Sequence, residues 1–79
     1  MDEITNELNQ IFRRVFNDKT IEITDAMTAQ DIAEWDSLNH INLIVAIEKQ
    51  FAISFTTREV MSFQNVGDLI KSIRGKKAG

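Results

Sequence analysis

The chain has 79 residues, enough for one small domain, and it contains no cysteine and a single histidine. These counts exclude a disulfide scaffold, a thiolate zinc site and a cysteine nucleophile, and they argue against a histidine-rich metal site. Hydrophobic residues make up 43% of the chain and charged residues 27%, which is typical of a folded globular protein. We therefore expect residues 1–79 to form a single cytoplasmic, monomeric domain whose last few residues fray.

The net charge is −3, and its distribution is uneven. No apolar run approaches the roughly 18 residues of a membrane-spanning helix, so membrane insertion is not expected. The stretch from Thr20 to Glu48 contains six acids and neither lysine nor arginine. Such a stretch argues against nucleic acid as a partner and favours proteins with basic surfaces. The six acids are Glu22, Asp25, Asp31, Glu34, Asp36 and Glu48.

The first predicted element is an amphipathic helix from about Glu3 to Phe16, with Asp2 as its N-cap. A loop from Asn17 to Trp35 follows, in which no strand pattern is sustained. Loops of this length inside a compact domain are usually functional. We expect three apolar side chains of this loop to hold it on the core: Met27, Ile32 and Trp35.

The second helix is predicted to begin at Asp36–Ser37 and to reach about Gln50, with Phe51 closing the core. Apolar residues recur along it at helical spacing: Leu38, Ile41, Ile44 and Val45.

Two shorter patterns follow in the sequence. Thr56 and Glu59 form a capping box that opens a short helix. Asn65 caps a last helix, with Asp68 in its first turn and Gly75 as its predicted stop. The fold class is therefore all-α, with three main helices, one short helix and a long loop between the first and second helices.

Ser37 stands out because it ends the long loop and opens the second helix. A phosphate ester at this position would lie near free helical N–H groups. Position alone favours a serine that merely helps to start the helix. A catalytic triad with Asp36 and His40 is disfavoured, because all three residues sit within one turn and no separate orienting acid is evident. The acids do not form a calcium loop, since the alternating Asp/Asn pattern with a central glycine is missing. No metal site is predicted.

The segment Glu34–Ile41 resembles the modification site of acyl carrier proteins, where an Asp-Ser-Leu triplet opens the second helix. The resemblance extends to Ile44–Phe51, to the loop Phe51–Phe55 and to Asn65–Ile70. It implies a small acyl-carrier-like helical bundle with a 4′-phosphopantetheine arm on Ser37. The arm would hold acyl intermediates as thioesters and deliver them to enzymes, so the protein itself would be a carrier and not an enzyme.

The implied partners are a phosphopantetheinyl transferase and acyl-loading, elongating or transferring enzymes with basic docking patches. Asp36 would assist the transferase by engaging its metal, and Leu38 would offer it an apolar contact. The resemblance also suggests four residues as lining for an acyl chain between the helices: Ile41, Val45, Ile47 and Ile53.

This sequence departs from the family pattern at two places. Asp-Leu-Gly often precedes the site in the family, whereas Asp31–Trp35 lacks the glycine. The acidic character of the second helix is diluted by Asn39, His40, Asn42 and Lys49, which puts docking to housekeeping fatty-acid enzymes in doubt. The open alternatives are a carrier for fatty-acid synthesis, a carrier for a dedicated polyketide or lipid pathway, an aminoacyl or peptidyl carrier, and an unmodified helical adaptor.

Overall fold

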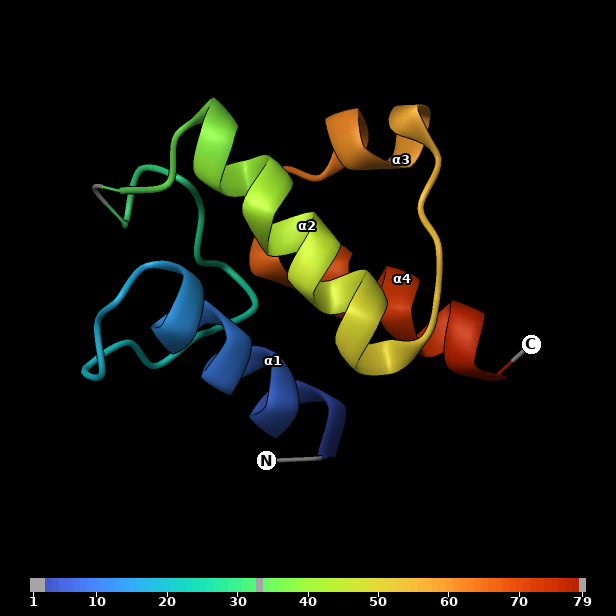
Figure 1. Cartoon of the computed structure of the whole chain (residues 1–79), viewed down its shortest axis with the longest axis horizontal. Coiled ribbons are helices and arrows are strands. Elements are labelled where there is room, and N and C mark those ends of the chain that lie inside the picture. Colours follow the sequence, from blue (N-terminus) through green and yellow to red (C-terminus); the bar gives the residue numbers. More distant parts are fainter. Residues whose placement is uncertain (1–2, 33, 79) are drawn as a thin grey trace.

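The computed structural model describes residues 3–32 and 34–78 of the chain. Within these ranges it contains four α-helices and no β-strand, in the order α1 (Glu3–Val15), α2 (Ser37–Phe51), α3 (Thr57–Ser62) and α4 (Val66–Ala78). Figure 1 shows α1 below α2, with α4 passing behind α2 and the short α3 at one end of the bundle. This order confirms the predicted all-α class and the long loop between the first two helices.

Helix α1 is strongly amphipathic and presents its apolar face to the rest of the bundle. Leu8, Ile11 and Phe12 on this face are fully buried. The helix ends where Asn17 adopts a left-handed conformation with φ of 51°, which asparagine tolerates better than most residues. Asp2, the predicted N-cap, lies outside the described residues.

Helix α2 divides its apolar residues between two faces. Leu43, Ile44 and Ile47 are buried against the core. The helix ends at Phe51, which is buried, and Ala52 follows in a left-handed conformation with its N–H donating to the carbonyl of Glu48.

The two C-terminal helices begin with the predicted caps. Thr56 and Glu59 form the full capping box of α3. The side chain of Asn65 accepts the N–H of Asp68 at 2.9 Å in the first turn of α4. The predicted stop at Gly75 is wrong, because α4 continues to Ala78. A single glycine costs a helix only up to about 1 kcal/mol, and the packing of the preceding turns outweighs that cost.

The first loop, residues 16–36, is held to the bundle by hydrogen bonds as well as by apolar contacts. The N–H of Ile23 donates to the Oδ1 of the buried Asn9 at 2.7 Å, and Arg13 Nε donates to the carbonyl of Ile21 at 2.7 Å. Further along, the N–H of Val66 donates to the carbonyl of Met27 at 2.9 Å. These bonds satisfy backbone groups that no regular element would satisfy.

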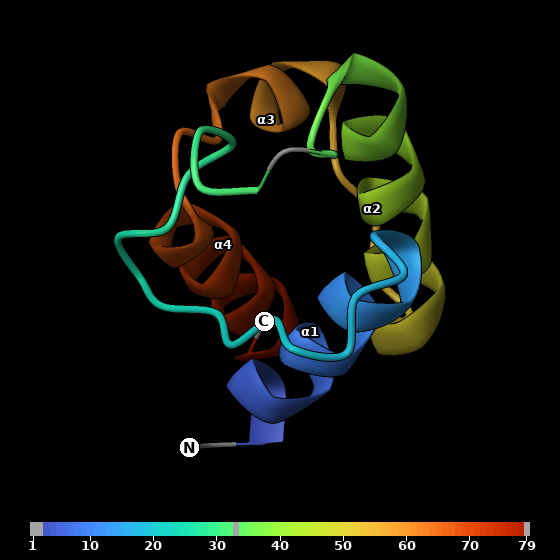
Figure 2. The same ribbon diagram turned by 90° about the vertical axis from the view of Figure 1, so that its left-hand side faces the viewer.

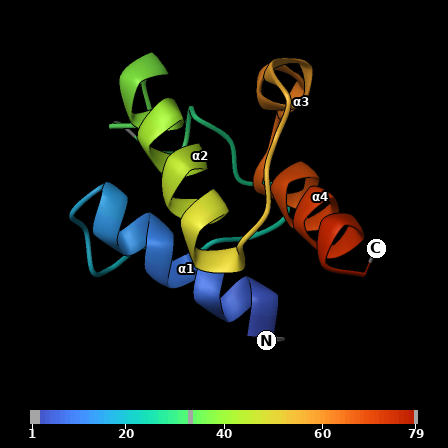
Figure 3. The same cartoon turned by 45° about the vertical axis from the view of Figure 1, so that its right-hand side comes forward.

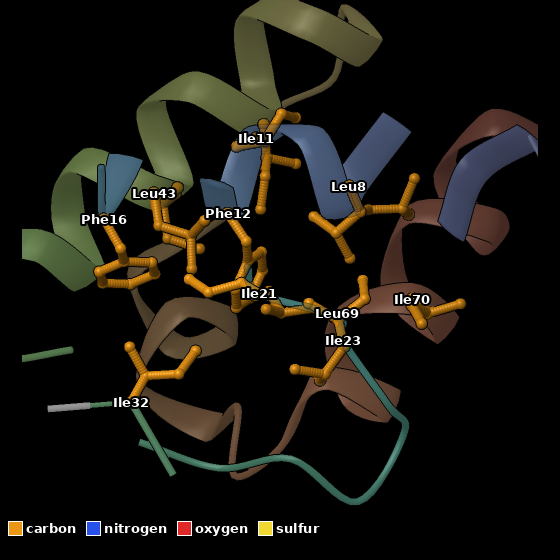
Figure 4. Close-up of a cluster of buried hydrophobic side chains, with 14 of the residues drawn as sticks. Leu8, Ile11, Phe12, Phe16, Ile21, Ile23, Ile32, Leu43, Leu69 and Ile70 are labelled. Carbon is orange, nitrogen blue, oxygen red and sulfur yellow. The ribbon is translucent and has the colours of Figure 1, made fainter. Parts of the chain in front are cut away.

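One core joins α1, α2, α4 and the first loop, and Figure 4 shows side chains from these segments meeting in a single cluster. Ile32 is buried in it, while Met27 and Trp35 are partly buried against it, which confirms the three predicted anchors of the loop. The described core residues are Leu8, Ile11, Phe12, Phe16, Ile21, Ile23, Ile32, Leu43, Ile44, Ile47, Phe51, Val66, Leu69, Ile70 and Ile73.

Candidate functional site

Ser37 is the first residue of α2, and its side chain is exposed. Asp36 immediately before it is the N-cap, with extended backbone angles and a carboxylate oxygen that accepts the N–H of Asn39 at 2.8 Å. The cap fixes the point at which the chain turns from the loop into the helix. The Ser37 hydroxyl is therefore presented at a rigid helix start and is open to an approaching enzyme.

A shallow hollow of about 430 Å³ lies beside Ser37, between the start of α2 and the short helix α3. Figure 2 shows the close approach of these two elements, with α3 at the N-terminal end of α2. Most of the residues that line the hollow are apolar or uncharged, and Asp36 supplies a carboxylate at its edge. The lining residues are Ala29, Trp35, Asp36, Ser37, His40, Val60, Met61, Phe63 and Gln64.

His40 lies in the wall of this hollow and connects two segments that are distant in sequence. Its Nδ1 lies 3.0 Å from the indole Nε1 of Trp35, and its Nε2 lies 3.1 Å from the carbonyl oxygen of Val60 in α3. Both ring nitrogens are thus engaged away from Ser37. The structure agrees with the rejection of a Ser–His–Asp triad, because the imidazole is not placed to take the serine proton.

Trp35 occupies the predicted anchoring position, two residues before Ser37. Its ring meets Phe12 edge to face, with centroids 5.3 Å apart, and it stacks on the His40 ring at 6.1 Å. Phe16 adds a third contact at 6.0 Å. Aromatic contacts of this kind fix the end of the first loop and so fix the position of Ser37.

The outer face of α2 carries apolar side chains that the core does not use. Leu38 is 68% exposed, Ile41 57% and Val45 43%, at spacings of three and four residues that place them along one side of the helix. Met61 of α3 is also exposed, on the rim of the hollow. We call Leu38, Ile41 and Val45 the apolar stripe of α2.

The apolar stripe corrects one sequence-based expectation. Ile41 and Val45 are exposed on the outer face of α2 and are not part of the core, and Val45 borders an open hollow together with Arg14 of α1. Ile47 is fully buried within the core, and Ile53 is partly buried against it. The helical pattern alone could not separate the two apolar faces of α2, since the run Leu43–Ile47 is apolar all round.

The acidic residues of the middle stretch lie mainly in the first loop and at its junction with α2. Glu22, Asp25, Asp31, Glu34 and Asp36 are exposed there. Glu48, the acid that α2 itself contributes, accepts the N–H of Phe55 at 2.8 Å and so braces the following loop. Among the described residues, no group of three or more histidine, aspartate or glutamate side chains is arranged to hold a metal ion.

Comparison with known proteins identifies the family. The sequence profile described as the phosphopantetheine attachment site matches residues 6–73, which is most of the chain. The chain belongs to the phosphopantetheine attachment site family. As a member, it is a carrier protein rather than a catalyst, and its prosthetic group is a covalently attached 4′-phosphopantetheine.

Relatives with known descriptions agree with this assignment. The acyl carrier proteins of Rickettsia massiliae and Rickettsia typhi are each 28% identical to this family member over 71 residues, covering 90% of this chain and 81% of theirs. The solution structure of the holo acyl carrier protein from Geobacter metallireducens is 42% identical. It superimposes with a TM-score of 0.91 over 98% of this chain and 88% of that one. Each of these relatives is described as an acyl carrier protein, and this family member is similar to them over most of its length.

The residues at the start of α2 fit a phosphodiester-linked arm. An exposed hydroxyl at the first helical position is open to phosphoryl transfer, and the neighbouring helical N–H groups favour negative charge there. The adjacent hollow, which Ser37 also lines, would offer apolar surface to such an arm. No helix in the part of the carrier protein that the structure describes is long and apolar enough to cross a membrane.

Two features of the site were not predicted. A spacing of three residues puts His40 on the same face of α2 as Ser37, but it gives no sign of the bonds to Trp35 and Val60. Gly67 lies inside α4, where nothing in the sequence explains a glycine. A Cβ there would lie 3.1 Å from the carbonyl oxygen of Asp25, so a larger residue would crowd the first loop. Both features depend on contacts between segments that only the folded chain brings together.

Proposed function

We propose that Ser37 is the attachment point of the 4′-phosphopantetheine arm. The observation that carries this proposal is an exposed serine at the first position of a capped α2, beside an apolar hollow, in a member of the phosphopantetheine attachment family. The arm supplies a thiol, which this cysteine-free chain does not have, and acyl groups are carried on that thiol as thioesters.

The residues around Ser37 have distinct roles in this proposal. Asp36 holds the helix start through its bond to Asn39 N and leaves its second carboxylate oxygen to interact with the transferase or its metal. Leu38 is 68% exposed next to the serine and offers the transferase an apolar contact. A phosphopantetheinyl transferase would bind at the start of α2. The enzymes that load, elongate or transfer the acyl group would dock on the same face of the helix.

The test is intact-protein mass spectrometry after incubation with coenzyme A and a transferase of broad specificity. Wild type should gain one phosphopantetheine group. Ser37→Ala should gain none, while Ser54→Ala, a second exposed serine, should gain one as wild type does. A folded, apo wild-type protein that gains nothing would overturn the assignment and leave the unmodified helical adaptor as the better description.

We further propose that the carrier serves a dedicated pathway, such as polyketide or modified-lipid synthesis, rather than housekeeping fatty-acid synthesis. This proposal is supported by the outer face of α2, where the apolar stripe alternates with Asn39 and Asn42 and no acid precedes Glu48. Electrostatic steering onto a basic docking patch would depend instead on the loop acids near Asp36. Aminoacyl loading remains the alternative within the family, and cytoplasmic location, a monomeric state and a single domain remain predictions.

The pathway proposal is tested by the double substitution Asn39→Asp and Asn42→Asp. Added acids should increase turnover of the holo protein with fatty-acid elongation enzymes, and this gain should shrink as salt is raised. Parallel loading reactions with acyl and aminoacyl donors would separate the two kinds of carrier. Efficient turnover of the unchanged holo protein by fatty-acid elongation enzymes would contradict the dedicated-pathway assignment.

A further inference from the structure

His40 connects three parts of the molecule at the hollow beside Ser37. It belongs to α2, it contacts Trp35 at the end of the first loop, and it reaches Val60 in α3. Trp35 is itself packed on Phe12 of α1. Figure 3 shows α3 standing apart from α1. Helix α3 is instead supported by its contacts with the start of α2 and with α4.

The two hydrogen bonds determine the protonation state of the imidazole. The indole N–H of Trp35 can only donate, so Nδ1 of His40 must be an unprotonated acceptor. The carbonyl of Val60 can only accept, so Nε2 must carry the proton. The arrangement therefore requires the neutral Nε2–H tautomer, and neither the Nδ1–H tautomer nor the imidazolium satisfies both partners.

Helix α3 depends on few contacts to keep its position. None of its residues is buried. Val60 and Phe63 pack partly against the core, Phe63 meets Phe55 edge to face, and Glu59 pairs with Lys76 of α4 at 3.1 Å. These contacts hold α3 to the core and to α4, and the bond from His40 ties it to the start of α2.

We propose that His40 is a positioning residue that fixes both walls of the hollow beside Ser37, and that it does so only as the neutral Nε2–H tautomer. Protonation places a second N–H on Nδ1, facing the indole N–H of Trp35, and that bond is lost. The bond from Nε2–H to Val60 is kept, because the imidazolium still donates there. Protonation of the ring would therefore release the wall made by Trp35 while α3 stays attached to α2.

The charged groups around His40 do not replace its partners. Asp36 lies on the rim of the same hollow, with one oxygen bound to Asn39 N. Glu34 on the loop is exposed. On α3, Glu59 is turned to Thr56 and Lys76, and Arg58 is exposed.

The bridge can be tested on the apo protein by NMR, because Trp35 is the single tryptophan and gives one indole N–H signal. The ¹⁵N shifts of the imidazole report its tautomer. Solvent exchange of the indole N–H reports whether the Trp35 bond is closed. His40→Gln is the matched control, since its amide oxygen can accept from Trp35 and its amide N–H can donate to Val60 without titrating.

The expected result at about pH 8 is an Nε2–H tautomer, with indole exchange equally slow in wild type and His40→Gln and about tenfold faster in His40→Ala. When the pH is lowered until the ¹⁵N shifts show a doubly protonated ring, indole exchange in wild type should rise toward that of His40→Ala, while His40→Gln still exchanges slowly. The amide shift of Val60 should move in His40→Ala but change little on acidification of wild type. Circular dichroism and melting temperatures would establish that every variant is folded.

An Nδ1–H tautomer at pH 8 would overturn the proposal. So would a wild type whose indole exchange stays as slow as that of His40→Gln once its ring carries two N–H protons, or a folded His40→Ala variant whose indole exchange is as slow as that of wild type.

The positioning role toward the arm rests on the proposed attachment at Ser37. After loading, shifts of the Val60 and Met61 amides between apo and holo forms should appear in wild type and His40→Gln at pH 8, and should be weaker in His40→Ala. Equal shifts in all three would exclude a role toward the arm. Failure to load would be seen separately in the mass spectrum, and the measurements on the apo protein would still test the bridge.

Discussion

The N–H of Gly67 donates a 2.9 Å hydrogen bond to the carbonyl oxygen of Asp25, which places the first turn of α4 directly against the first loop. A Cβ at Gly67 would lie 3.1 Å from that same oxygen, whereas a Cβ at Gly75, in the same helix, would have no neighbour within 4 Å. The two glycines should therefore respond in opposite ways to replacement by alanine.

Gly75→Ala should raise the free energy of unfolding by up to about 1 kcal/mol, because alanine is the better helix former and nothing obstructs it. Gly67→Ala should lose this gain and lower stability, because the loop backbone must move to admit the methyl group. Urea denaturation of both variants measures the difference. A Gly67→Ala protein as stable as Gly75→Ala would show that the loop yields without cost.

Asn9 is a buried polar residue in α1, and its side-chain oxygen is the partner of the Ile23 N–H at 2.7 Å. Asn9→Leu should reduce the free energy of unfolding by about 1–3 kcal/mol, because the N–H of Ile23 would be left buried without an acceptor. Hydrogen exchange at Ile23 should accelerate more than exchange within α2. Asn6→Leu, at an exposed position of the same helix, is the matched control and should change stability little.

Glu59 links the cap of α3 to α4. The hydrogen bond from the Thr56 N–H, followed by that from Lys76, lowers the pKa of the Glu59 carboxyl below its ordinary value of 4.5. Because the folded state favours the ionised form, its contribution to stability is complete above that ordinary value and is lost as the pH falls through the lowered pKa. Glu59→Gln should thus be less stable than wild type at neutral pH, and the difference should close on acidification. Thermal unfolding of both proteins from neutral pH down to about pH 3 would measure this stability difference. A difference that stayed constant with pH would show that the charge of Glu59 is not its cause.

The apolar stripe of α2 should contribute to recognition and little to stability. Leu38→Ala should change the free energy of unfolding by no more than about 0.5 kcal/mol, because the side chain is largely in solvent. Leu43→Ala, on the buried face of the same helix, should cost about 2–5 kcal/mol. If the transferase contacts the apolar stripe, Leu38→Ala should also slow the transfer of phosphopantetheine from coenzyme A to Ser37. An unchanged loading rate would place the transferase contact elsewhere.

Features set by local chemistry could be predicted from the sequence. The cap at Asp36, the capping box of Thr56 and Glu59, and the Asn65 cap each involve residues three apart, so the pattern is visible in the chain. Gly75 misled the prediction because a glycine after a periodic run is typical of a helix end, whereas here α4 continues through it.

The candidate site was predictable only in part. Ser37 was marked by its place at the start of α2 and by the resemblance around it, and both depend on neighbouring residues. The role of His40 depends on Val60, and that of Gly67 depends on Asp25. Both partners are distant in sequence, so no local pattern predicts these contacts. The outward direction of Ile41 and Val45 was missed because a helix with apolar residues on two faces has no single hydrophobic side.

The division of α2 into a buried face and an exposed apolar stripe has a consequence for how such a carrier could change over time. Substitutions at Leu38, Ile41 and Val45 alter what a visiting enzyme touches without disturbing the side chains that hold the bundle together. Partner choice can therefore drift or be re-engineered by transplanting a few surface residues onto an unchanged scaffold.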